Sequence, residues 1–144
     1  ERLDHLRKQS VHPEAAGVAA KAFKEVQYHW SHSSQWVIRL GDGTEESHAK
    51  VQESLTNLWA YAGEFFMADE LDKLAASQGL LPNLDEVKTA WLERVIATCN
   101  EATLSVPEAT WHRKGGKQGI HSEHLSYMLA EMQVLPRTYP DAAW

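Results

Sequence analysis

Residues 14–40, EAAGVAAKAFKEVQYHWSHSSQWVIRL, carry the clearest structural signal because their apolar positions recur after four and then three residues. This spacing predicts a long amphipathic helix that packs nearly parallel to a neighbour. Pro13 suits the start of such a helix and Gly41 suits its end. We therefore expect a helix of roughly 40 Å, a length typical of helical bundles. The apolar seam consists of Ala19, Phe23, Val26, Trp30, Ser33, Val37 and Leu40.

Two further long helices are predicted. Residues 41–44 are a short connection and Thr44 is a good N-cap, so the second helix should run antiparallel to the first. Asn83 begins the third long helix, which should end before Pro107. The seams are Val51, Leu55, Leu58, Ala62 and Phe65 in the second helix, and Leu84, Val87, Trp91, Val95, Thr98 and Ala102 in the third.

Shorter helices are expected between and after the long ones. Asp69 can cap one that ends at Gly79, and Ser122 can cap one that ends at Pro136. Residues 105–120 contain several glycines and should be a loop. No segment of useful length alternates apolar and polar residues, so no sheet is predicted. The expected fold class is all-α, an antiparallel up-and-down helical bundle.

Composition narrows the class of protein. With 144 residues, of which 43% are hydrophobic, the chain suits a single helical domain over residues 1–144. Its net charge of −6 argues against a nucleic-acid binder, which would normally be basic. No apolar run is long enough to span a membrane. Cys99 is the lone cysteine, which excludes an internal disulfide and fits a reducing, cytoplasmic compartment. The first residue is Glu1 rather than Met, so we expect a processed or truncated chain.

A second stripe on the first long helix is the main candidate site. Lys21, Glu25, His29 and His32 follow one another at spacings of four, four and three residues. A di-iron centre in a bundle needs Glu-x-x-His pairs, whereas Glu25 and His29 are four apart and a lysine lies one turn away. Three interpretations remain open: a polar core in which Lys21 and Glu25 neutralise each other, a solvated face, and a set of metal ligands.

Two other groups are weak metal candidates. Glu45 and His48 form the one Glu-x-x-His of the chain, but they lie in the first turn of their helix. There Glu45 has the simpler role of compensating the helix dipole. His121 and His124 are three apart with no further Cys or His nearby, so capping and packing of a helix start is the simpler role for them.

Residues 111–119, WHRKGGKQG, are basic and glycine-rich in an acidic protein. Arg113, Lys114 and Lys117 could dock a partner protein or an anionic ligand, or could belong to an exposed flexible loop. The segment lacks the Gly-Lys-Ser/Thr of a P-loop and follows no predicted strand, so it is not a nucleotide-binding loop of that type.

Several short stretches follow one another in an informative order along nearly the whole chain. They are residues 21–29 (KAFKEVQYH), 39–44 (RLGDGT), 100–104 (NEATL), 115–125 (GGKQGIHSEHL) and 129–133 (LAEMQ). Together they resemble the phenylacetic acid catabolic protein family, and most of all its structural, non-catalytic branch. The resemblance implies a ferritin-like bundle. It also implies that the chain is the C-terminal part of a longer protein, without the N-terminal helices of that bundle.

The resemblance implies a role in aerobic phenylacetate catabolism. A multicomponent di-iron monooxygenase of this family epoxidises the aromatic ring of phenylacetyl-CoA in a catalytic A subunit that is homologous to this chain. Further small subunits and a reductase complete the complex. This chain is then expected to bind no cofactor itself and to dock and stabilise the catalytic subunit, whose di-iron centre needs rigid support.

Two alternatives to this role remain. The full-length chain could itself be a di-iron oxygenase, or it could be a CoA-ester-binding module that uses Arg113, Lys114 and Lys117. A bundle without its first helices would expose an apolar face, so a homo-oligomer is also expected. Tryptophan is enriched at protein interfaces, and we expect at least one tryptophan off the seams to lie at a contact between subunits. These tryptophans are Trp36, Trp111 and Trp144.

Overall fold

The computed structural model describes residues 1–108 and 111–143. All regular structure within these ranges is helical, so the predicted all-α class is confirmed. The chain forms two compact units, Glu1–Arg113 and Lys114–Trp144. Trp144, one of the tryptophans expected at a contact, lies outside the described residues. Within those residues, no helix is both long enough and apolar enough to cross a membrane.

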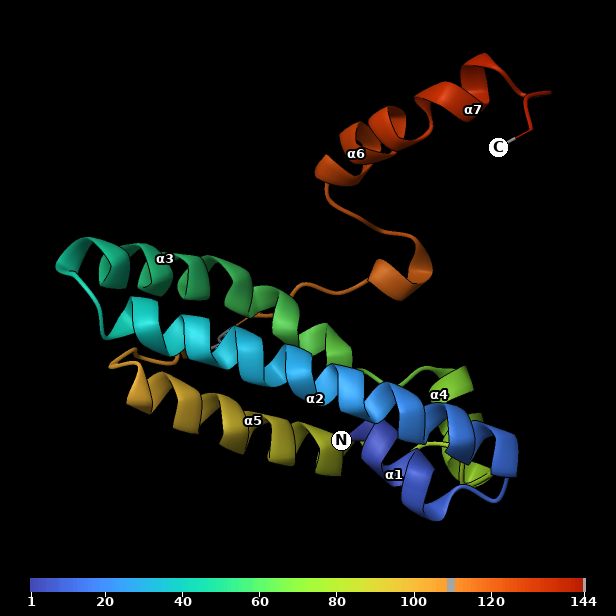
Figure 1. Ribbon diagram of the computed structural model, residues 1–144, viewed down its shortest axis with the longest axis horizontal. Helices are drawn as coiled ribbons and strands as arrows, with labels where there is room; N and C mark the ends of the chain where they lie inside the picture. The colour runs from blue at the N-terminus through green and yellow to red at the C-terminus, as the bar shows by residue number, and fades with distance from the viewer. Residues whose placement is uncertain (109–110, 144) are drawn as a thin grey trace. The chain divides into compact units, whose positions relative to one another are not determined.

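Three long helices make up most of the first unit: α2 (Pro13–Gly41), α3 (Glu45–Ala62) and α5 (Leu84–Glu101). They lie side by side, and α2 contacts both of the others (Figure 1). A tight turn joins α2 to α3, so these two helices run antiparallel as predicted. This arrangement is consistent with a ferritin-like helical bundle.

The helix starts follow the predicted capping chemistry. The Thr44 hydroxyl accepts a hydrogen bond from the backbone N–H of Ser47 at the start of α3. The Asn83 side chain accepts from the N–H of Asp85 at the start of α5. Asp69 forms a full capping box at the start of α4 (Glu70–Ser77). Each bond satisfies a backbone donor that the first turn of a helix leaves unpaired.

The core of the first unit is small and lies at one end of the long helices. Cys99, Ala102 and Leu104 are its buried members, and side chains of α2, α3 and α5 pack around them. Other seam positions reach solvent: Val26 is 50% exposed and Leu58 is 65% exposed. The seams therefore predicted the helices correctly, but within this chain only part of their apolar surface is covered.

Two short elements close the other end of the first unit. Helix α1 (Arg2–Gln9) packs against α2, where the Arg7 guanidinium lies 4.2 Å from the ring centroid of Phe23. The 3-10 helix η1 (Gly63–Phe66) continues directly from α3. Arg2 donates a hydrogen bond of 3.1 Å to the Phe65 carbonyl, so α1 is also fixed to η1.

The second unit holds η2 (Gly116–Gln118), α6 (His124–Met132) and α7 (Val134–Thr138). Two predictions for this region are wrong. Ser122 is not the N-cap of α6, because the helix begins one residue later and Glu123 precedes it without a side-chain cap. Pro136 does not end a helix but lies in the first turn of α7. A proline is tolerated there because the first N–H groups of a helix have no partner within it.

Candidate functional site

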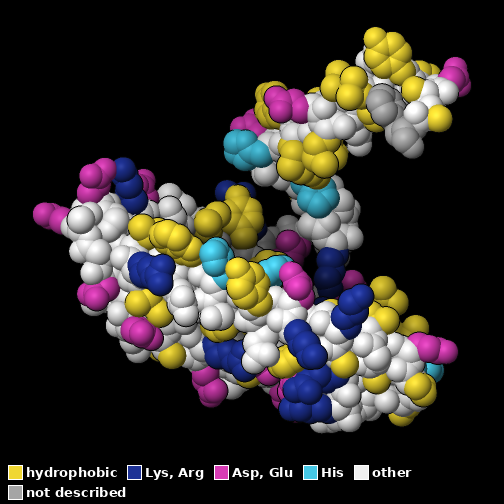
Figure 2. All heavy atoms as spheres, in the orientation of Figure 1, with side chains coloured by type: hydrophobic (Ala, Val, Ile, Leu, Met, Phe, Trp, Pro, Cys, Tyr) yellow, Lys and Arg dark blue, Asp and Glu magenta, His cyan; other side chains and the backbone are white. Residues whose placement is uncertain are grey.

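The polar stripe predicted on α2 lies on an exposed face. Lys21, Glu25, His29 and His32 are all exposed, so within this chain they form a surface stripe and not a polar core. Nε2 of His29 lies 3.3 Å from a carboxylate oxygen of Glu25, and the two side chains are 63% and 73% exposed. Figure 2 shows histidine side chains beside hydrophobic ones on the first unit.

Of the interpretations left open for this stripe, the pairing of Lys21 with Glu25 is not the contact seen among the described residues, where Glu25 pairs with His29. The physical reason is the direction of the helix. A carboxylate placed four residues before a basic group forms the better pair, whereas Lys21 precedes its carboxylate.

An aromatic row runs along the same face of α2. Tyr28 stacks on His32 with ring centroids 5.9 Å apart, and His32 meets Trp36 edge-on at 6.4 Å. The Arg39 guanidinium lies 5.7 Å from the centroid of the Trp36 ring. We call Tyr28, His32, Trp36 and Arg39 the α2 ladder. Sequence reasoning singled out His32 and Trp36 but missed the other two, although spacings of four, four and three residues place all four on one face.

The ladder has the chemistry of a protein contact. Tyr28 is 63% exposed and Trp36 is 48% exposed, so both side chains are accessible to a partner. Both rings contact His32, which lies between them, so binding would fix few new rotamers. Tryptophan, tyrosine and arginine are the residues that contribute most to protein–protein affinity.

His48, a weak metal candidate, has a structural role. Its Nδ1 lies 2.7 Å from the carbonyl oxygen of Gly41 and 3.4 Å from the hydroxyl of Thr103. A carbonyl can only accept, so Nδ1 carries the hydrogen and donates it. Thr103 itself has the unusual φ of 58° and donates to the same carbonyl at 3.3 Å. These contacts join the end of α2, the start of α3 and the end of α5.

The other metal candidates are scattered. Glu45 is exposed in the first turn of α3, which suits dipole compensation. His124 begins α6, whereas His121 lies before that helix, and both are exposed. Across residues 1–108 and 111–143, no three His, Cys, Asp or Glu side chains come together in a group that could hold a metal ion.

The three cations of the predicted basic loop belong to different units. Arg113 ends the first unit, where its backbone N–H donates to the Ala60 carbonyl at 2.8 Å. Its guanidinium lies 5.1 Å from the Tyr61 ring centroid and 5.2 Å from that of Trp111. Lys114 and Lys117 lie in the second unit, so the structure defines no joint basic patch.

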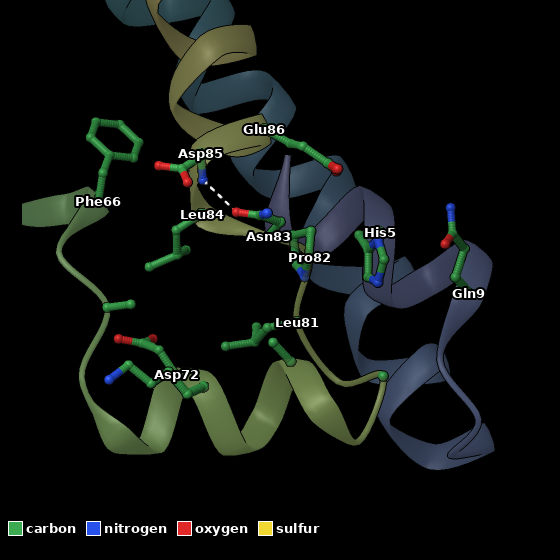
Figure 3. A pocket seen from close by; sticks show the side chains of 14 residues that line it. His5, Gln9, Phe66, Asp72, Leu81, Pro82, Asn83, Leu84, Asp85 and Glu86 are labelled. Atoms are coloured by element: carbon green, nitrogen blue, oxygen red, sulfur yellow. Dashed lines mark hydrogen bonds between the residues drawn. The ribbon is translucent and has the colours of Figure 1, made fainter.

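A cavity of about 530 Å³ between α1, α4 and the segment before α5 carried no sequence signal (Figure 3). Leu81 and Leu84 point into it, and Asp72 lies at its wall. Asp72 is already engaged, because its carboxylate accepts from the N–H of Asp69 in the capping box of α4. This carboxylate thus helps to hold the start of α4 in place.

The fold and these surfaces define an all-α bundle protein whose longest helix presents an exposed polar and aromatic face. The chain matches the family described as phenylacetic acid catabolic protein over residues 1–144, and it belongs to that family. It is 43% identical over 136 residues to the C subunit of 1,2-phenylacetyl-CoA epoxidase from Escherichia coli (strain K12). The match covers 94% of this chain and 55% of that relative, so the chain spans little more than half of the relative's length.

Proposed function

We propose that this protein is the structural subunit of a multicomponent monooxygenase that epoxidises the aromatic ring of phenylacetyl-CoA in phenylacetate catabolism. The observation that carries the proposal is the 43% identity to the C subunit of such an epoxidase, which extends over 94% of the chain. In this role it docks a homologous catalytic A subunit, alongside further small subunits and a reductase. The proposed compartment is the cytoplasm, where the lone, buried Cys99 stays reduced.

The exposed face of α2 supports a docking role. The α2 ladder offers two aromatic rings and a guanidinium that are pre-arranged on a rigid helix. A partner helix laid along this face would bury them and satisfy the polar groups of the neighbouring stripe. Support of this kind holds the metal-ligating side chains of an adjacent subunit in productive geometry.

The residues of α2 do not fit a di-iron centre. Glu25 is paired with His29 at a spacing of four residues, and Lys21 shares their face. A lysine ammonium competes with a cation for the same carboxylate. We therefore assign the iron and the oxygen chemistry to the catalytic partner and derive no step through iron in this chain.

The test is to purify the complete protein alone and together with its catalytic partner, and to measure iron in each sample. We expect the two subunits to co-purify in a fixed ratio, with iron in the pair and none in stoichiometric amount in this protein alone. Stoichiometric iron in the protein alone would instead make it an oxygenase in its own right. Failure of the two subunits to associate would refute the docking role.

A further inference from the structure

A second cavity, of about 370 Å³, lies inside the first unit between the α3–η1 junction, α5, residues 106–108 and His112. Three aromatic rings form one wall. The indoles of Trp59 and Trp91 stack with centroids 5.8 Å apart, and the Phe66 ring lies 5.2 Å from that of Trp91. The rest of the lining is mainly aliphatic. Tryptophan and phenylalanine faces of this kind favour flat aromatic partners.

One imidazole stands out in this apolar lining. Nδ1 of His112 is buried and has no hydrogen-bond partner among the described residues. Most buried polar atoms in folded proteins are paired, because an unpaired one loses its interaction with water and gains nothing in return. A ligand that brings its own hydrogen-bonding group into the cavity would give His112 the partner that the protein does not supply.

The position of His112 is set by its neighbours. A Cβ built on Gly63 would lie 2.5 Å from Cγ and 2.6 Å from Nδ1 of His112, so the ring rests directly on the glycine. The next residue, Arg113, is fixed to Ala60 by its backbone and to two aromatic rings by its guanidinium. This wall of the cavity therefore exists before any ligand binds, which lowers the cost of binding.

We propose that this cavity binds a small neutral aromatic molecule of one or two rings, whose single polar group forms a hydrogen bond with His112. The volume lies near the lower end of the range for ligand pockets, about 300–1,000 Å³, which suits one or two rings and excludes a large cofactor. The two charged residues in the lining, Lys88 and Glu108, have opposite signs and so favour no net charge on the ligand. The inference rests on the geometry of the first unit and is independent of the proposed function.

The experiment measures binding of three probes to the complete protein by calorimetry and by ligand-observed NMR. Phenol has a ring and a hydroxyl, toluene has the ring alone, and cyclohexanol has the hydroxyl without an aromatic ring. We expect phenol to bind about threefold to tenfold more tightly than cyclohexanol, which is the usual advantage of an aromatic pair. Equal affinity for phenol and cyclohexanol, or no binding of either, would overturn the proposal.

Two variants test the role of His112. His112→Ala should weaken phenol binding by about threefold to tenfold, the effect of one lost hydrogen bond, and should leave toluene binding no weaker than before. Gly63→Ala should also weaken phenol binding because the new methyl group displaces the imidazole. The matched controls are His12→Ala, an exposed histidine, and Gly17→Ala, where a Cβ meets nothing within 4 Å. Unchanged phenol affinity in a folded His112→Ala protein would refute the assignment.

Discussion

Gly41 at the end of α2 lies directly against Ala102 after α5: a Cβ on Gly41 would fall 2.5 Å from the Ala102 carbonyl oxygen and 2.9 Å from its Cβ. Both residues are buried, and Ala102 belongs to the core. Only a glycine allows two helix ends to approach this closely. The contact joins two of the stretches, 39–44 and 100–104, on which the resemblance to the family rests.

Gly41→Ala is therefore expected to destabilise the protein. Forcing a methyl group into this packed contact should lower the free energy of unfolding by about 1–3 kcal/mol. Urea unfolding followed by circular dichroism measures the change. Gly17→Ala is the matched control, because it also lies in α2 but has open space around it, and alanine there should stabilise the helix by about 0.5–1 kcal/mol. A neutral Gly41→Ala would show that the two helix ends do not pack this closely.

His48→Ala should lower the free energy of unfolding by about 1–2 kcal/mol. It removes the imidazole that donates a hydrogen bond to the carbonyl of Gly41, at the buried end of α2. His29→Ala should change stability by less than about 0.5 kcal/mol, since its side chain is largely exposed. Thermal unfolding with and without a chelator checks both. If the loss for His48→Ala disappeared in the presence of the chelator, the residue would be acting as a metal ligand and not as a structural donor.

Trp36→Ala should weaken binding to the proposed catalytic partner. A tryptophan at the centre of an interface contributes about 2 kcal/mol or more, which corresponds to a dissociation constant raised roughly thirtyfold. Surface plasmon resonance on the complete protein gives the change. Leu71→Ala, at an exposed apolar residue of α4, serves as the control and should bind as the parent protein does. Equal affinity for both variants would place the interface away from the α2 ladder.

The helix α1 should contribute pH-dependent stability. The pKa of Asp4 is lowered from 3.8, first by its hydrogen bond from Lys8 and also by Arg7. A carboxyl whose pKa is lower in the folded state stabilises the fold above its unfolded pKa, and the contribution is lost as the pH falls through the folded pKa. The melting temperatures of the parent protein and Asp4→Asn should thus differ near neutral pH and converge in acid. A constant difference down to low pH would contradict this.

Cys99 should react slowly with thiol reagents. It is buried in the core, and burial raises its pKa above the ordinary value of 9.0, so little thiolate is present. A chromogenic disulfide reagent at pH 8 should label the folded protein far more slowly than the urea-unfolded one. Equal rates would mean that the core around α5 opens readily.

The helices could be predicted from sequence because their signals are local. The four-three spacing in α2 and the caps at Thr44, Asp69 and Asn83 act within one or two turns. The prediction that Pro136 ends a helix was wrong because a proline is equally compatible with the first turn of a new helix. The seams did not predict how exposed their own residues are, because an apolar stripe on a helix does not identify the element that packs against it.

The sites were harder to predict because they join distant parts of the chain. The Glu-x-x-His of Glu45 and His48 has the spacing of a metal motif, yet the imidazole bonds to a carbonyl seven residues earlier. The aromatic cavity brings together α3, α5, residues 106–108 and His112, and no single stretch carries its pattern. The α2 ladder is the exception, because exposed aromatic residues one turn apart on a predicted helix could have been noticed.

Because the lone cysteine, Cys99, is buried, a second cysteine placed on the surface could be labelled selectively. Replacing exposed Gln35, which lies beside the α2 ladder, with cysteine would create a reactive handle without removal of Cys99. A photoactivatable cross-linker attached there would form a covalent bond with whatever lies across this face. The peptide that it captures would identify the neighbouring chain and the stretch of it that covers α2.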